Sequence, residues 1–182
     1  MRASFVCCAI LVLALAAPET GRAGETYGLG RPATSAEIAG WDIDVSPDGS
    51  GLPPGQGSAL EGKAIFEGKC AFCHGTRGEG KPMDQLVGAI GSMNDVKPRK
   101  TVGSFWPYAT TLFDYVHRAM PFNAPQSLTS DEVYAVCAYI LFLNKIIAED
   151  AVLNAKTLPQ IKMPYADHFV SAYPQATPKV GP

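Results

Sequence analysis

The segment Cys70-Ala-Phe-Cys73-His74 constrains this chain more than any other feature, because two cysteines stand three positions apart and a histidine follows the second. Two thiols at this spacing on a helical turn can bond to the two vinyl groups of a haem, and the next side chain is then placed at the iron. The segment therefore predicts one covalently attached c-type haem, held by Cys70 and Cys73, with His74 as an axial ligand of the iron.

Other uses of these residues find less support in the sequence. A zinc site needs further ligands at suitable spacing, and the chain has no second C-x-x-C pattern or histidine pair. A thioredoxin-like redox pair belongs to a strand-helix-strand pattern, which is not visible here. A chance occurrence in a helix is the remaining alternative. Cys137 lies on the apolar face of a predicted helix, where we interpret it as a small buried hydrophobic residue.

Residues 1–23 predict a signal peptide. Arg2 precedes an apolar run of thirteen residues, from Phe5 to Ala17, and small residues flank a possible cleavage site after Ala23. The run suits the apolar region of a signal peptide and is too short to span a bilayer. An uncleaved anchor, or cleavage after Ala17, is the alternative. We therefore expect export, with a periplasmic location in a bacterium.

The charge that remains after cleavage excludes one class of partner. Removal of residues 1–23 leaves 13 basic residues against 16 acidic ones, a net charge of −3. No basic stripe or cluster exists, so nucleic-acid binding is not expected. No later apolar stretch is long enough to cross a membrane, so the mature form should have no stable membrane span.

The mature sequence divides by composition into an arm, a domain and a tail, predicted at residues 24–57, 58–146 and 147–182. The arm is rich in Gly, Pro and Ser, includes a short helix near Ser35, and is interpreted as a strap over the core. The tail holds several prolines. Long irregular stretches are unusual inside a compact domain, and a buried haem would give them a partner to pack on.

Helical periodicity predicts three helices in the domain, over 58–69, 110–119 and about 129–144. The third is the clearest, because Thr129 and Glu132 form a capping box at its start and Asn144 is a plausible end. The fold class is therefore predicted as all-α, with three or four helices around one covalent haem. Residues 75–109 show little periodicity and are predicted as loop.

A second axial ligand is expected at Met120, which precedes Pro121 just after the second predicted helix. The alternative is that Met120 fills a gap in the core, as methionine often does. Weaker rivals are Met83, Met93, Met163 and His117, the last interpreted as a surface or capping group. A ligating imidazole usually donates its other N–H to a carbonyl or carboxylate, and the carbonyl of Pro82 is the candidate acceptor for His74.

At these residues the chain resembles the class I cytochrome c domain over roughly Ser58 to Asn144. The resemblance rests on Gly62, Phe66, the Met120-Pro121 pair and Tyr139, together with the haem segment. It implies that the first and last helices cross near the glycine and the two aromatic residues.

A narrower resemblance extends beyond the domain, through 41–49, 101–109 and 158–164. These segments are similar to the cytochrome subunits of sulfane and sulfite dehydrogenases of the bacterial sulfur-oxidation pathway. The resemblance implies a molybdenum, sulfite-oxidase-like partner that oxidises a sulfur compound and passes electrons to the haem. A downstream cytochrome or oxidase would then receive them. Some members of that family carry two haems, whereas this chain has a single C-x-x-C-H segment.

The sequence therefore predicts an electron-transfer protein rather than an enzyme, serving as a subunit of an oxidoreductase complex. The arm and the tail motivate the subunit interpretation, because a free carrier does not need them. One alternative is a freely diffusing periplasmic carrier that serves a terminal oxidase. The other is a haem enzyme or sensor with an open distal position, which requires Met120 to be a packing residue.

Overall fold

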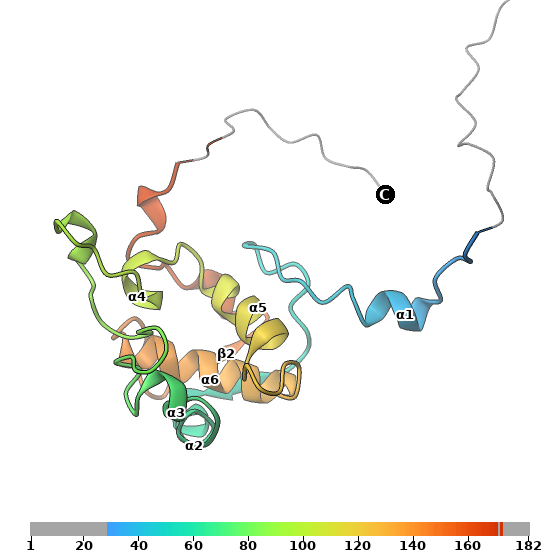
Figure 1. The fold of residues 1–182 in the computed structure, drawn as a ribbon, viewed down its shortest axis with the longest axis horizontal. Helices are drawn as coiled ribbons and strands as arrows, with labels where there is room; N and C mark the ends of the chain where they lie inside the picture. The colour runs from blue at the N-terminus through green and yellow to red at the C-terminus, as the bar shows by residue number, and fades with distance from the viewer. Residues whose placement is uncertain (1–28, 171, 173–182) are drawn as a thin grey trace, which may run out of the picture.

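The fold is built around one long helix, α6 (Ser130–Leu143). The computed structural model of the protein describes residues 29–170 and 172. Figure 1 shows the other elements arranged around α6, with the first helix set apart from the rest. These elements are α1 (Ser35–Ala39), β1 (Gln56–Ser58), α2 (Ala59–Lys69), α3 (Ala71–His74), η1 (Ser92–Asn94), α4 (Val102–Phe105), α5 (Ala109–Ala119), β2 (Val152–Asn154), η2 (Leu158–Gln160) and η3 (Ala166–His168).

Helix α6 is buried because its sequence is apolar on every side. Each residue from Val133 to Leu141 is buried. The predicted capping box is present, since the Thr129 hydroxyl accepts from the Glu132 amide while the Glu132 carboxylate accepts from the Thr129 amide. A fully apolar helix needs partners on several faces, and α2, α5 and both strands supply them.

Helices α2 and α6 cross in close contact, as the resemblance implied. A methyl group placed on Gly62 would overlap the backbone carbonyl of Ala135 on α6. Next to this contact the rings of Phe66 and Tyr139 pack at 5.4 Å between centroids, tilted by 60°. Glycine at position 62 therefore sets how near the two helices can approach.

Helix α5 forms another wall of the core. Its apolar stripe, which includes Leu112, Phe113 and Val116, is buried, and Phe113 packs against Tyr134 of α6 at 4.5 Å. All three predicted domain helices are present, two of them with starts shifted by one residue. The structure also contains α4 and η1 inside the stretch 75–109, which was predicted as loop.

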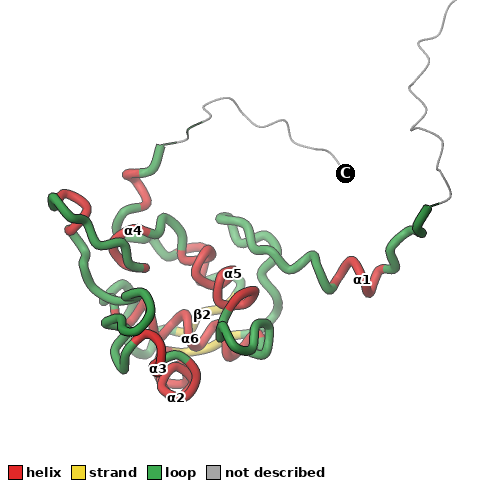
Figure 2. The backbone as a smooth tube through the Cα atoms, in the orientation of Figure 1, coloured by secondary structure: helices red, strands yellow, loops and turns green. Residues whose placement is uncertain are grey.

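A small sheet joins the arm to the tail, and the sequence analysis missed it. Strand β1 pairs antiparallel with β2, and Gly57 lies opposite Leu153. Three-residue strands are too short to show an alternating pattern, so they could not be predicted from the sequence. The described part of the chain is mostly helical, which confirms the predicted class, and its one short two-stranded sheet is a minor addition (Figure 2).

The predicted strap exists only for residues 45–57. The buried Asp114 carboxylate accepts from the Val45 amide at 2.9 Å, and the Tyr134 hydroxyl donates to the Pro53 carbonyl at 2.9 Å. Residues 29–44, by contrast, are exposed throughout except for the half-buried Ile43. Figures 1 and 2 show α1 lying away from the packed helices.

Two sequence interpretations fall partly or wholly outside the described residues. The predicted signal peptide, residues 1–23, lies outside them, as does the end of the tail beyond residue 172. Within the part of the chain that the structure describes, no helix has the length and apolar character needed to cross a bilayer.

Candidate functional site

The haem segment forms the end of α2 and the single turn of α3. The Cys70 amide still donates to the Phe66 carbonyl at 2.8 Å, and the chain then turns so that the Cys73 and His74 amides both donate to the Cys70 carbonyl, at 3.1 and 3.0 Å. Residues three and four apart on a helical turn share a face. The structure therefore places Cys70, Cys73 and His74 on one helical turn, with both cysteines partly exposed and in no disulfide.

The imidazole of His74 is oriented by a backbone carbonyl. Its Nδ1 lies 2.8 Å from the Asp84 carbonyl oxygen. A carbonyl only accepts, so Nδ1 carries the proton and donates, which leaves the lone pair of Nε2 available to a metal. The prediction that the Pro82 carbonyl plays this role was wrong by two residues.

A tight turn in the loop explains the difference. The Lys81 amide donates to the Met83 carbonyl, and the Met83 amide donates to the Cys73 carbonyl, both at 2.9 Å. These bonds return the chain to the haem segment only after the proline, so that Asp84 is the residue beside the imidazole. Gly78 permits the return with φ of +70°, where a side chain would also collide with Val87.

The predicted second ligand, Met120, lies at the C-cap of α5. Its amide donates to the Val116 carbonyl at 3.1 Å, and its half-buried side chain packs against the core. Among the rivals, Met163 is 1% exposed and enclosed by core side chains, so its sulfur has no free face. Met83 sits on the loop that follows His74, and Met93 lies beside the tail aromatics.

The Cys70 thiol lies in a partly buried setting. Burial raises the pKa of the Cys70 thiol to about 11, so this thiol is neutral at pH 7. Like Cys70, the half-buried apolar side chains of Ile65, Leu86 and Trp106 pack against the core. Cys137 is fully buried as predicted, and burial raises the pKa of its thiol far above the ordinary value.

The donor set fits a haem and does not fit a protein-built metal site. Two thiols, an imidazole with a free Nε2 and a thioether on another element match the groups that attach a c-type haem and fill its two axial positions. Among the residues that the structure describes, no three His, Cys, Asp or Glu side chains gather where they could bind a metal ion. The zinc alternative therefore has no support within those residues.

His117 differs from its sequence interpretation. Predicted as a surface or capping group, it is half-buried, and its Nδ1 is buried with no hydrogen-bond partner among the described residues. Its ring lies 5.7 Å from that of Phe113. The reason is its place on the stripe of Phe113, Val116 and Met120, because residues three and four apart on a helix share a face.

Two buried polar residues that hold the site together were missed by sequence reasoning. Asn144, predicted only as a helix end, donates from Nδ2 to the Leu86 carbonyl at 3.2 Å and accepts on Oδ1 from the Gly88 amide at 3.0 Å. It thereby fixes the loop that follows His74 to the end of α6. Asp114 anchors the strap and pairs with Arg118. Each is a polar residue inside an apolar stripe, which was the available signal.

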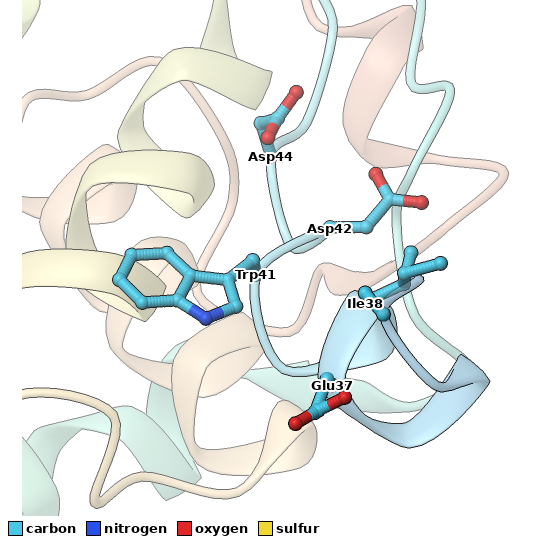
Figure 3. Close-up of a pocket in the computed structure, with 6 residues that line it drawn as sticks. Glu37, Ile38, Trp41, Asp42 and Asp44 are labelled. Carbon is cyan, nitrogen blue, oxygen red and sulfur yellow. The ribbon is translucent and has the colours of Figure 1, made fainter. Parts of the chain in front are cut away.

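One open hollow lies apart from these residues, on the arm. Figure 3 shows it, and its volume is about 520 Å³. It is lined by Ala33, Glu37, Ile38, Trp41, Asp42 and Asp44.

Comparisons with known proteins agree with this geometry. The family model described as "Cytochrome c" matches residues 59–144. One solved structure, the crystal structure of the sulfane dehydrogenase SoxCD from Paracoccus pantotrophus, contains a chain 44% identical to this one. The match covers 83% of this chain and 73% of that one, with a TM-score of 0.76. No curated protein sequence matches.

Proposed function

Since this chain belongs to the cytochrome c family, as a class I c-type cytochrome, we propose that it is the electron-accepting subunit of a molybdenum dehydrogenase that oxidises a sulfur compound. Family membership makes it an electron-transfer protein with covalently attached haem c, rather than an enzyme in its own right. One observation supports the finer role, namely the 44% identity over 83% of the chain to a chain of a sulfane dehydrogenase.

We assign the attachment of the haem to Cys70 and Cys73, and its axial ligation to His74 and Met120. The bound haem supplies an iron that takes up and releases one electron at a time. The Asp84 carbonyl, 2.8 Å from Nδ1 of His74, fixes the orientation of the imidazole and strengthens it as a ligand. A thioether opposite an imidazole raises the potential of the iron, which suits an acceptor of electrons.

Ligation by two side chains of the chain itself also bears on the alternatives. If His74 and Met120 both bound the iron, no position would be open to a substrate or gas, and a haem enzyme or sensor would be disfavoured. We further propose that the protein works in the periplasm, because residues 1–23 have the pattern of an export signal. Its electrons would pass onward to a downstream cytochrome or oxidase.

The distal assignment is tested by Met120→Ala in the haem-loaded protein. We expect a sharp fall in midpoint potential, because the thioether is lost, and rapid binding of carbon monoxide by the ferrous form. The matched control is Met83→Ala, which should change neither. An unchanged potential in Met120→Ala would remove this residue from the ligands.

The partner is tested by purifying the tagged, full-length protein from its native cells. We expect a molybdenum protein to co-purify in a fixed ratio, and to reduce the haem when sulfite or a sulfane-sulfur compound is added. A chain that elutes alone, and whose haem reacts with a terminal oxidase instead, would favour the freely diffusing carrier.

A further inference from the structure

Residues 29–44, which we call the free arm, carry large apolar side chains that the described fold leaves in solvent. Leu29, Ile38 and Trp41 are 90%, 53% and 86% exposed. Helix α1, inside this segment, buries no residue. A five-residue helix is too short to be stable by itself in water. Helix α1 also obtains little stability from packing, because its side chains are exposed.

The conformation of the free arm is nevertheless specified in detail. The Thr34 hydroxyl accepts from the Glu37 amide, and the Glu37 carboxylate accepts from the Thr34 amide. Arg31 also holds this carboxylate, with Nη1 donating to Oε2 at 2.8 Å. These hydrogen bonds favour the helical conformation and so reduce the conformational freedom that the segment would lose when it binds. The free arm therefore combines a specified local conformation with exposed apolar side chains.

The side chains of the free arm define the chemistry of its partner. Figure 3 shows the Trp41 indole extending to one side of the backbone, and the Asp42 carboxylate extending to the other. Over residues 29–44 the acidic residues are Glu37, Asp42 and Asp44, and Arg31 is the sole basic one. A complementary surface therefore has an apolar depression that receives the indole, with lysine or arginine at its edge.

The comparisons indicate which partner that is. The family match begins at residue 59. The part of the chain from there to residue 182 makes up about two thirds of the sequence. A likeness that covers 83% of the chain must therefore reach back into the arm. The arm that precedes the electron-carrying domain is therefore also part of the likeness to a chain of a dehydrogenase complex.

We propose that the free arm docks on the molybdenum subunit, with Trp41 inserted in an apolar depression that basic residues border. This inference rests on the proposed function and adds the surface through which the two subunits hold each other. Tryptophan is a frequent anchor in interfaces, where its loss costs tenfold or more in affinity. The anchored strap, which begins at Val45, would transmit this attachment to the haem domain.

The test uses the full-length, haem-loaded protein and the molybdenum protein recovered with it. We expect Trp41→Ala to raise the Kd for that protein at least tenfold. The exposed position of Trp41 means that its haem spectrum and melting temperature should stay unchanged. The matched control is Leu60→Ala, which removes a 62% exposed apolar side chain on α2 and should leave the Kd unaltered.

A second variant tests the charges. Asp42→Asn with Asp44→Asn should raise the Kd severalfold and reduce its dependence on salt, because fewer charges then face the basic edge.

The outcomes separate the two proposals. If the wild-type protein accepts electrons from the molybdenum protein but Trp41→Ala binds it as tightly as wild type, the docking inference is wrong and the proposed function stands. If wild type neither binds nor accepts electrons, both are wrong. A homodimer that Trp41→Ala dissociates would assign the free arm to a second copy of this chain, and would also overturn the inference.

Discussion

Helices α1 and α6 begin with the same device and have opposite surroundings. Thr34 with Glu37 and Thr129 with Glu132 form complete capping boxes. Yet α6 buries every residue from Val133 to Leu141, whereas α1 buries none. The local signal fixes where a helix begins, and the packing decides how much that helix adds to the free energy of unfolding. The difference marks α6 as the core of the electron carrier and α1 as a surface for recognition.

The largest effect on stability should come from disturbing the close packing of α2 against α6, because α1 has no such packing. Gly62→Ala should lower the free energy of unfolding by about 1–3 kcal/mol, the range for overpacking a tight contact, because the Ala135 backbone is in the way. Denaturant unfolding measures this. The control lies in the same helix at Gly68, where nothing lies within 4 Å; there alanine should stabilise by about 0.5–1 kcal/mol. Equal effects at both positions would contradict the close crossing.

The next effect comes from removing each cap in turn. Thr129→Ala should destabilise the domain by about 1 kcal/mol, the usual value for an N-cap, because α6 unfolds with the core. Thr34→Ala should leave the unfolding midpoint unchanged and lower only the helix content of residues 35–39, read by NMR chemical shifts. A domain destabilised equally by Thr34→Ala would mean that α1 packs on the core.

The smallest effect concerns pH and is confined to α1. Hydrogen bonds from Arg31 and then from Thr34 lower the pKa of Glu37 from 4.5 to about 2. Because the pKa of Glu37 is lower in the folded segment than in the unfolded one, the charged carboxylate stabilises the folded form at pH values above 4.5. This stabilisation is lost as the pH falls from 4.5 toward 2. NMR titration of the Glu37 carboxyl carbon should show the low value, and Arg31→Ala should raise it. A titration near 4.5 in the wild type would show that the Arg31 pair does not form.

The features that could be predicted from the sequence are those encoded by residues close together in the chain. The haem segment and the Thr129 capping box are each encoded within one or two helical turns, and the three domain helices are encoded by periodicity along a continuous segment; the structure contains these helices and the capping box as predicted. The Asp84 carbonyl beside His74 could not be predicted, because it depends on how a glycine-rich loop returns. The roles of Asn144 and Asp114, and the pairing of β1 with β2, depend on contacts between segments distant in the chain.

Exposure of the free arm had no signal either. Its composition resembles that of the strap, which is held by contacts with distant helices, among them those of Asp114, Thr110 and Tyr134. A sequence can thus show that a segment is able to form a helix without showing whether the rest of the chain covers it.

The account depends most directly on the covalent attachment of one haem through the two thiols of the C-x-x-C-H segment. Intact mass spectrometry of the protein purified from its native cells, followed by mass analysis of the peptide that contains residues 70–74, tests it. We predict a mass equal to the mature polypeptide plus one haem, with the added mass on that peptide. A colourless protein whose mass equals that of its amino acids alone would contradict the account.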